Sequence, residues 1–337
     1  MPALVSGRKV RVAFVGTGGN ARAHMRDVHR DPLAEISALC DTSAQALADT
    51  VARLPELAAV PQFSDYRTMI TEVKPDGVVI SIPHTLHFAA AAYALEHGVS
   101  VESEKPLTCS PEDARALITR RDRTGLVLTV GYQRHYQGVW RWVHEHVAGG
   151  ASGPVHFVEA WQCQNWGGGG WRGVPELSGG GQLNDSGSHL CDMMLWAGGI
   201  RPTEVFAFQE NRGLQVDRIS AISFRFPGPG VGTMAIIGDS VRGMDEGMQF
   251  WCRDGRVRVD GIDNQVKVTY FSPDGAAHPV AVEEIPDYPV NKDGNFVRCI
   301  LGQDEPQVPA ECGLAVAAFT EAVYRSVRNN APAKVDW

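Results

Sequence analysis

The sequence contains neither a long hydrophobic run nor an excess of positive charge. No apolar stretch approaches the ~18 residues that a membrane-spanning helix needs, so we expect no membrane-embedded part. Asp and Glu number 39 against 31 Lys and Arg, and the net charge is -8. Domains that bind nucleic acid are typically basic, and a nucleic-acid partner is therefore not expected.

Paired cysteines are also lacking. The seven cysteines are scattered, odd in number and never spaced as C-x-x-C. Disulfide frameworks and structural zinc sites both show characteristic cysteine spacings, so the sequence predicts neither. The first residues run quickly into a strand pattern instead of the apolar core of a signal peptide. Together with the lack of a membrane span, this predicts a cytoplasmic protein.

The chain does have length and apolar content. Its 337 residues, 44% of them hydrophobic, are enough for two domains of ordinary size, each with its own core.

The N-terminal part opens with a strand pattern that runs into glycines. Residues 10–15 are almost continuously apolar, as in a parallel strand covered on both faces. Gly16, Gly18 and Ala21 follow with the spacing G-x-G-x-x-G/A. The first makes a tight turn, the second lets the backbone approach a pyrophosphate, and the third allows close helix packing. A helix that begins near Asn20 would offer its N-H groups to the phosphates.

An acidic residue is expected about 20 positions beyond such a turn, and Asp41 closes the next apolar run, 36–40. Its carboxylate can accept hydrogen bonds from a ribose 2'-hydroxyl but repels a 2'-phosphate. Residues 42–45 contain no arginine that would offset the repulsion. The sequence therefore predicts NAD as cofactor in preference to NADP.

Strand and helix patterns alternate up to residue 131, which predicts six strand-helix units in a domain of residues 1–131. Lys105, one of six lysines, follows the strand 99–103 between Glu104 and Pro106. Ligands bind at the carboxyl ends of parallel strands, so we expect Lys105 to act near the nicotinamide. His87 fits a ligand contact and a backbone-bonded helix start equally well. The candidate cofactor-binding residues are Gly16, Thr17, Gly18, Gly19, Asn20, Ala21, Asp41, Pro83, His84 and Glu104.

The pattern changes in residues 132–337, which we assign to a second domain. Seven strand-like runs, several joined by tight turns, predict a largely antiparallel sheet with helical stretches at 290–301 and 311–328. The expected fold class is α/β, with two domains. So many strands leave a broad face that the few remaining helices do not cover, which predicts a homodimer or homotetramer.

Between the first two of these strands lies the stretch 177–192, LSGGGQLNDSGSHLCD. Asp185 and His189 are four positions apart, so on a helix they project from one face. An acid beside an imidazole suits proton transfer; a buried pair that only holds the loop is the alternative. A metal site of His189, Cys191 and Asp192 is disfavoured because the three are too close in sequence to converge from one helix. No metal is predicted.

Tryptophans and arginines supply candidate substrate contacts. Trp161, Trp166 and Trp171 lie near the glycine run 167–170, where an indole can stack on the apolar face of a sugar, although core packing also explains them. Arginine binds hydroxyl or carboxylate oxygens. We expect Arg134, Trp171 and Arg172 to bind a small-molecule substrate.

Three motifs in this order resemble the glucose-fructose oxidoreductase, inositol dehydrogenase and rhizopine-catabolism (Gfo/Idh/MocA) family. They are GTGGNA after the first strand, EKP at 104–106, and GGGQLNDSGSHLCD with its D-x-x-x-H spacing. The resemblance covers nearly the whole chain. It implies a Rossmann domain followed by an α/β domain whose large open sheet often forms the subunit interface. By position, Lys105, Asp185 and His189 match the family's catalytic residues, and Ala21 replaces the third glycine of the turn.

The resemblance also implies NAD(P)-dependent hydride transfer from a sugar, polyol or inositol-type hydroxyl. His189 would act as general base, Lys105 would stabilise the charge on the substrate oxygen, and Asp185 would orient His189 or hold a neighbouring hydroxyl. Two alternatives remain open. One is an NAD-dependent glycosidase that uses transient oxidation, and the other is a non-catalytic nucleotide-binding regulator.

Overall fold

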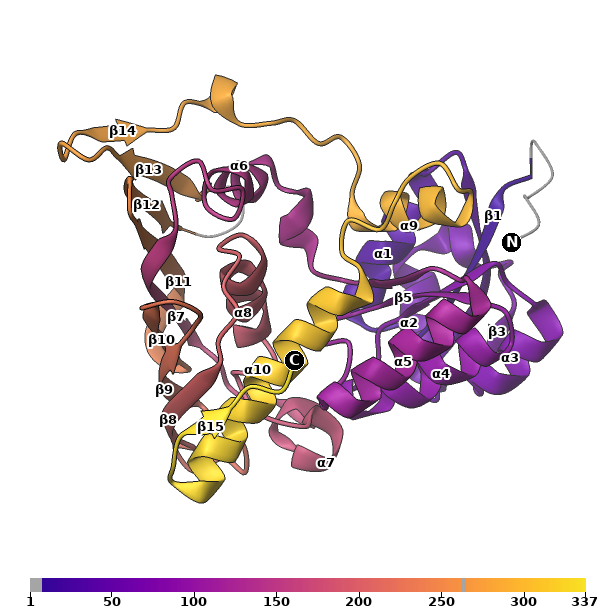
Figure 1. Cartoon of the computed structure of the whole chain (residues 1–337). Coiled ribbons are helices and arrows are strands. Elements are labelled where there is room, and N and C mark those ends of the chain that lie inside the picture. Colours follow the sequence, from indigo (N-terminus) through magenta and orange to yellow (C-terminus); the bar gives the residue numbers. More distant parts are fainter. Residues whose placement is uncertain (1–7, 262–264) are drawn as a thin grey trace. The chain divides into compact units, whose positions relative to one another are not determined.

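The computed structural model describes residues 8–261 and 265–337, which fold as two compact units (Figure 1). Unit 1 comprises 1–108, 112–132 and 290–313 of the chain, and unit 2 comprises 109–111, 133–289 and 314–337. Among the described residues, no helix is both long and apolar enough to cross a membrane. Each unit is described by itself below.

Unit 1 contains a six-stranded parallel sheet. The strand order is β3-β2-β1-β4-β5-β6, the order of a dinucleotide-binding sheet whose direction of winding reverses between β1 and β4. The strands are β1 (Val10–Val15), β2 (Ala34–Cys40), β3 (Gln62–Phe63), β4 (Gly77–Ile80), β5 (Ser100–Ser103) and β6 (Leu128–Val130). The helices are α1 (Gly19–Arg30), α2 (Ala44–Arg53), α3 (Tyr66–Val73), α4 (His87–Glu96), α5 (Pro111–Thr124) and α9 (Lys292–Ile300).

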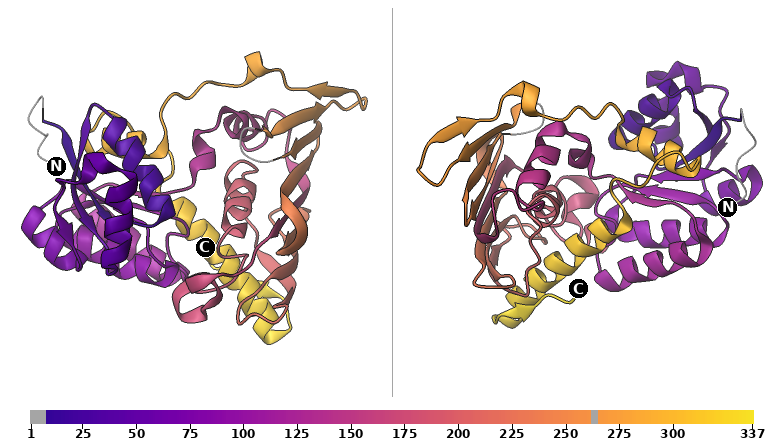
Figure 2. Two further views of the ribbon diagram at one scale, coloured as in Figure 1. Left: turned by 180° about the vertical axis from the view of Figure 1, so that it is seen from behind. Right: turned by 45° about the horizontal axis from the view of Figure 1, so that its top comes forward.

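The core of unit 1 explains why α9 belongs to it. Phe296, Val297 and Ile300 of α9 are buried in one cluster with Phe14 of β1 and with the inward face of α1. A side chain at Gly77 in β4 would lie 2.8 Å from both Phe296 and Ile300, so α9 packs directly on the strand. Figure 2 shows this segment returning to the sheet in two further views.

This packing differs from the division expected from the sequence, in which everything from 132 to 337 formed the second domain. The segment 290–313 folds with unit 1 because its apolar face completes the core over β1 and β4. The short segment 109–111 is grouped with unit 2. Beyond that short segment, the chain passes from unit 1 to unit 2 between Tyr132 and Gln133.

Unit 2 is built on a nine-stranded sheet with the order β14-β13-β12-β11-β7-β10-β9-β8-β15. Neighbouring strands are antiparallel except β7 and β10, which are parallel. The strands are β7 (Val155–Asn165), β8 (Glu204–Glu210), β9 (Ile219–Arg225), β10 (Val231–Ile237), β11 (Asp239–Cys252), β12 (Gly255–Asp260), β13 (Lys267–Phe271), β14 (Ala277–Pro279) and β15 (Ala333–Lys334). The helices are α6 (Gly138–His146), α7 (Pro175–Ser178), α8 (Gly187–Trp196) and, from residue 314 onward, α10 (Ala310–Asn329).

Burial alternates along the strands of this sheet. Ile222 and Phe224 of β9 and Met234 and Ile236 of β10 are buried, while the residues between them are exposed or half-buried. Period-2 alternation is expected of a sheet covered on one face. The expected fold class, a parallel N-terminal sheet followed by a mostly antiparallel one, is therefore confirmed.

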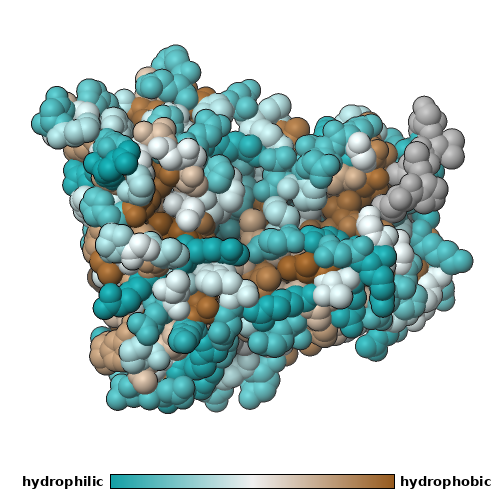
Figure 3. Space-filling model, in the orientation of Figure 1, coloured by the Kyte–Doolittle hydropathy of each residue, from teal (hydrophilic) through white to brown (hydrophobic). Residues whose placement is uncertain are grey.

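Hydrophilic side chains cover much of the molecular face drawn in Figure 3, with apolar side chains visible between them in patches. Such a mixture is ordinary for a protein surface.

Candidate functional site

The turn after β1 is shaped by two glycines with different roles. Gly16 has φ 93°, and a Cβ there would lie 2.1 Å from the carbonyl oxygen of Ser81. Only glycine therefore fits, because the turn packs against the segment that follows β4. Gly18 is the N-cap of α1, has no side-chain capping bond, and an added Cβ would meet no atom within 4 Å. The N-terminus of α1 is thus open to an approaching phosphate.

Asp41 lies at the end of β2 and is tied to this turn. Its Oδ2 accepts hydrogen bonds from the backbone N (2.9 Å) and the Oγ1 (3.0 Å) of Thr17, and its Oδ1 accepts from the N of Ser43 (2.9 Å). The structure therefore brings Thr17 and Asp41, two of the candidate cofactor-binding residues, into direct contact. Arg22 donates to the carbonyl oxygen of Thr17 at 3.0 Å, a neighbour that sequence reasoning missed.

These residues fit a dinucleotide. Three features lie at the carboxyl edge of one parallel sheet. They are the close turn at Gly16, the exposed residues 18–20 at the start of α1, and the carboxylate of Asp41. They would hold the pyrophosphate and a ribose.

The residues after β4 are bound into the protein interior. His84 is 3% exposed and its ring lies 5.8 Å from that of His87. His87 is fully buried, with Nδ1 2.8 Å from the carbonyl oxygen of Pro106 and Nε2 2.9 Å from that of Ile82. Burial lowers the pKa of His87. Of the two interpretations of His87, this geometry matches the backbone-bonded one.

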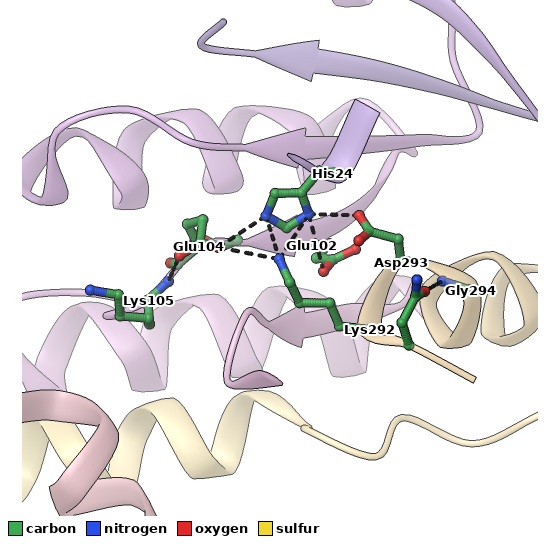
Figure 4. Close-up of polar contacts among 9 residues, drawn as sticks. His24, Glu102, Glu104, Lys105, Lys292, Asp293 and Gly294 are labelled. Atoms are coloured by element: carbon green, nitrogen blue, oxygen red, sulfur yellow. Dashed lines mark hydrogen bonds and ion pairs between the residues drawn. The ribbon is translucent and has the colours of Figure 1, made fainter. Parts of the chain in front are cut away.

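Lys105 follows β5 at the same edge of the sheet and is half-buried. Its backbone N donates to Oε2 of Glu104 at 3.2 Å. In Figure 4 the side chain of Lys105 points away from a group of buried charges that surrounds Glu104. We name this group the buried cluster; it consists of the buried residues His24, Glu102, Glu104 and Asp293 together with Lys292, whose side chain is 17% exposed.

Mutual attraction decides the charge states in the buried cluster. Burial alone lowers the pKa of His24, but the charge of Asp293 and hydrogen bonds to Asp293 and Glu104 raise it to about 10. Burial opposes the ionised form of Glu104, yet Lys292 and His24 hold its pKa well below the usual range. For Glu102, burial and the charge of Asp293 raise the pKa to about 8. His24 and Lys292 are therefore cations at neutral pH, and Glu104 is an anion.

Sequence reasoning placed Glu104 among the cofactor-binding residues and missed its partners. A glutamate in the apolar strand 99–103, Glu102, was a detectable signal of a buried charge. Nothing in the sequence indicated Lys292 and Asp293 as partners of Glu104, because Lys292 lies 188 positions away from it.

In unit 2, Asp217 anchors the glycine-rich loop that precedes α8. Its two carboxylate oxygens accept hydrogen bonds from the backbone N of Gly181 (2.7 Å) and of Leu183 (3.0 Å). The hydroxyl of Tyr324 donates to Oδ1 of Asp217 at 2.8 Å. The loop therefore holds a defined path up to Asp185.

Asp185 lies two positions before α8 begins and is buried. Its Oδ2 accepts from Nε1 of Trp166 (3.0 Å) and from Nε of Arg172 (2.9 Å). All three residues line a pocket of about 520 Å³ within unit 2. Arg172 also lies over the ring of Trp171, 4.5 Å from its centroid. His189 is half-buried in the first turn of α8.

Arg134 differs from the expectation. Both it and Glu246 are almost fully buried, and its Nη2 lies 2.6 Å from Oε1 of Glu246. A guanidinium enclosed with its own carboxylate is an internal ion pair, so the structure gives Arg134 no support as a substrate contact.

Two members of the disfavoured metal grouping, Cys191 and Asp192, have different neighbours. Oδ2 of Asp192 lies 2.9 Å from Nε2 of His135, whereas Sγ of Cys191 lies 3.8 Å from Sδ of Met234. The two side chains thus face different partners.

Comparisons with known proteins extend these observations. A model described as "Oxidoreductase family, NAD-binding Rossmann fold" matches residues 10–132. A second, described as "GFO/IDH/MocA C-terminal domain", matches residues 140–258.

Relatives and solved structures agree with the family models. The D-glucoside 3-dehydrogenase of Escherichia coli (strain K12) is 30% identical over 220 residues, 62% of this chain and 61% of the relative, so less than two thirds of the relative is matched. The inositol 2-dehydrogenase of Rubrobacter xylanophilus is 25% identical over 97% of this chain and 94% of its own. The WlbA dehydrogenase from Bordetella pertussis, solved with NADH and UDP-GlcNAcA, shares the fold, with a TM-score of 0.87 at 23% identity over 99% and 100% of the chains. The chain belongs to the Gfo/Idh/MocA family of oxidoreductases.

Proposed function

We propose that this protein oxidises a hydroxyl group of a sugar, polyol or inositol-type substrate with NAD. The observation that carries the proposal is the carboxyl edge of the parallel sheet, where the glycine turn and Asp41 follow β1 and β2 while Lys105 follows β5. A nucleotide site and a cation on one sheet edge suit a reaction in which negative charge develops on a substrate oxygen. Relatives named for a glucoside and an inositol support the substrate class.

The proposed roles follow the residue chemistry. Bound NAD would supply the hydride acceptor for the carbon that carries the hydroxyl. His189 takes the hydroxyl proton as general base, and Lys105 stabilises the resulting oxygen charge. Asp185, held by Trp166 and Arg172, binds a neighbouring hydroxyl of the substrate. Arg172 and Trp171 border the same substrate.

The test is a screen of sugars, glycosides, inositols and their acids for NADH formation by the pure protein. Formation of NADH from at least one polyol supports the proposal. Tight NADH binding without turnover of any compound would favour the non-catalytic regulator instead. Cleavage of an aryl glycoside that requires NAD but yields no net NADH would favour the glycosidase.

A further inference from the structure

The buried cluster joins three elements of unit 1. His24 comes from α1, Glu102 and Glu104 from β5 and the residue after it, and Lys292 and Asp293 from the first turn of α9. His24 Nδ1 lies 2.6 Å from Oδ1 of Asp293, and His24 Nε2 lies 2.9 Å from Oε1 of Glu104. Lys292 Nζ donates to the same Oε1 at 3.3 Å.

The two oxygens of Glu104 have different partners. Oε1 is held by His24 and Lys292, whereas Oε2 accepts the backbone N-H of Lys105. Glu104 therefore links His24 and Lys292 to Lys105, the residue that the proposed function assigns to the substrate oxygen. On the far side of Lys105, the carbonyl oxygen of Pro106 lies 2.8 Å from His87. The segment is thus held at both ends.

Such a cluster has a large energetic cost unless every charge is paired. Removing one partner of a buried pair leaves an uncompensated charge. His24 donates from both ring nitrogens only as the imidazolium, which matches its two carboxylate neighbours. The ammonium of Lys292 lies against the ring of His24, so two cations face the carboxylates of Glu104 and Asp293, while Glu102, whose pKa burial raises to about 8, is mostly protonated at neutral pH.

We propose that Glu104 is a positioning residue for Lys105, and that His24 and Lys292 hold its carboxylate in place. The proposal rests on the proposed function, in which Lys105 acts on the substrate oxygen. It reassigns Glu104 from cofactor binding to support of the catalytic segment. It also makes α9 a determinant of activity, since Lys292 holds one oxygen of Glu104 from outside the 1–132 stretch.

The test combines four variants: Glu104→Gln, Lys292→Met, Lys292→Arg and Arg298→Gln. The first two remove a charge of the bridge, and Lys292→Arg keeps the cation. Arg298→Gln is the matched control, because Arg298 also ties α9 to unit 1, through Asp31 at 2.8 Å, without contacting Glu104. Hydrogen exchange of the Lys105 amide is followed by mass spectrometry in the protein without substrate, and NADH affinity is measured by fluorescence.

We expect the Lys105 amide to exchange at least about tenfold faster in Glu104→Gln and Lys292→Met, because the side chain of residue 104 that accepts its hydrogen bond is no longer held by the full set of charged partners. NADH affinity should stay within about threefold. With a substrate from the screen, kcat should fall about 10- to 100-fold with little change in KM, as small misplacements of catalytic groups do. Lys292→Arg keeps the cation, so it should retain most of the protection of the Lys105 amide and most of kcat. Arg298→Gln should resemble the parent in both measurements.

Unchanged exchange and kcat in Glu104→Gln and Lys292→Met would overturn the proposal. Equal losses in Arg298→Gln would overturn it as well, because they would show general loosening of α9. The exchange experiment needs no turnover, so it tests the bridge even if the screen finds no substrate and the proposed function fails.

Discussion

At the scale of single residues, two arginines show how surroundings decide a role. The sequence predicts that Arg134 and Arg172 both bind substrate. Arg134 is enclosed with Glu246, whereas the side chain of Arg172 is 40% exposed and borders a pocket with Asp185. Charge and residue type are identical, and only burial and the partner differ. Asp185 and His189 are only four positions apart, yet they lie in different local structures. Asp185 lies before α8 and accepts hydrogen bonds from Trp166 and Arg172, whereas His189 lies in the first turn of α8.

The catalytic assignment predicts a separation of binding from turnover. Lys105→Ala and His189→Ala should each lower kcat at least about a hundredfold, as loss of acid-base and charge-stabilising groups does. NADH affinity should remain within a few-fold, because the glycine turn and Asp41 are unaltered. The double variant should lose less than the product of the single losses, since the proposed mechanism assigns both groups to one substrate oxygen. Steady-state kinetics and fluorescence titration measure these values; near-parental turnover in both single variants would contradict the assignment.

Cofactor preference is a second prediction at this scale. Asp41 should make NADH bind at least about tenfold more tightly than NADPH, since the carboxylate repels a 2'-phosphate. Asp41→Ser should reduce that ratio to a few-fold. Arg22, which bonds the carbonyl oxygen of Thr17, is the cation available to favour the phosphate, so adding Arg22→Gln should remove the gain in NADPH affinity. Tighter binding of NADPH by the parent protein would refute this prediction.

At the scale of elements, α9 is the segment whose place matters most. Its apolar side completes the core of unit 1 over β1 and β4, and its first turn supplies two charges to the buried cluster. One helix therefore contributes both packing and electrostatics, and the two contributions are separable because they lie on different residues.

The buried cluster also predicts a pH dependence of stability. The pKa of His24 rises from 6.5 to about 10 on folding, so the folded state holds a proton that the unfolded chain releases. This contribution is fully present below about pH 6.5 and is lost as the pH rises through about 10. Tm should therefore fall as the pH is raised from about 6.5 to about 10, and this decline should be smaller in His24→Gln. Thermal unfolding at several pH values measures it, with Arg298→Gln as the control; parallel curves for His24→Gln and the parent would contradict the prediction.

At the scale of the whole molecule, the nine-stranded sheet presents apolar side chains away from its buried side. Phe208 is 64% exposed, and with Phe206 and Trp161 it lines a shallow groove of about 250 Å³ across the sheet. Exposed apolar patches of this kind often mark subunit contacts.

We therefore expect a homodimer or homotetramer assembled through this sheet. Light scattering at micromolar concentration should give a multiple of 36.5 kDa. Phe208→Glu should shift the protein toward the monomer, because a charge cannot be buried unpaired in an apolar contact. The control Val241→Glu alters a side chain that is 97% exposed in β11. A parent protein of monomer mass would refute the prediction.

The sequence by itself determined the features that depend on neighbours within a few positions. These include the glycine turn, the strand-helix alternation of the first domain, the tight turns of the antiparallel sheet, and Lys105 at a strand end. Local sterics, hydrophobic periodicity and turn chemistry encode them directly. Only the tertiary structure decided that α9 returns to unit 1, that Glu246 encloses Arg134, and that His24 and Lys292 hold Glu104. Those pairings join residues far apart in the chain, and they form because the topology buries charges that then require partners.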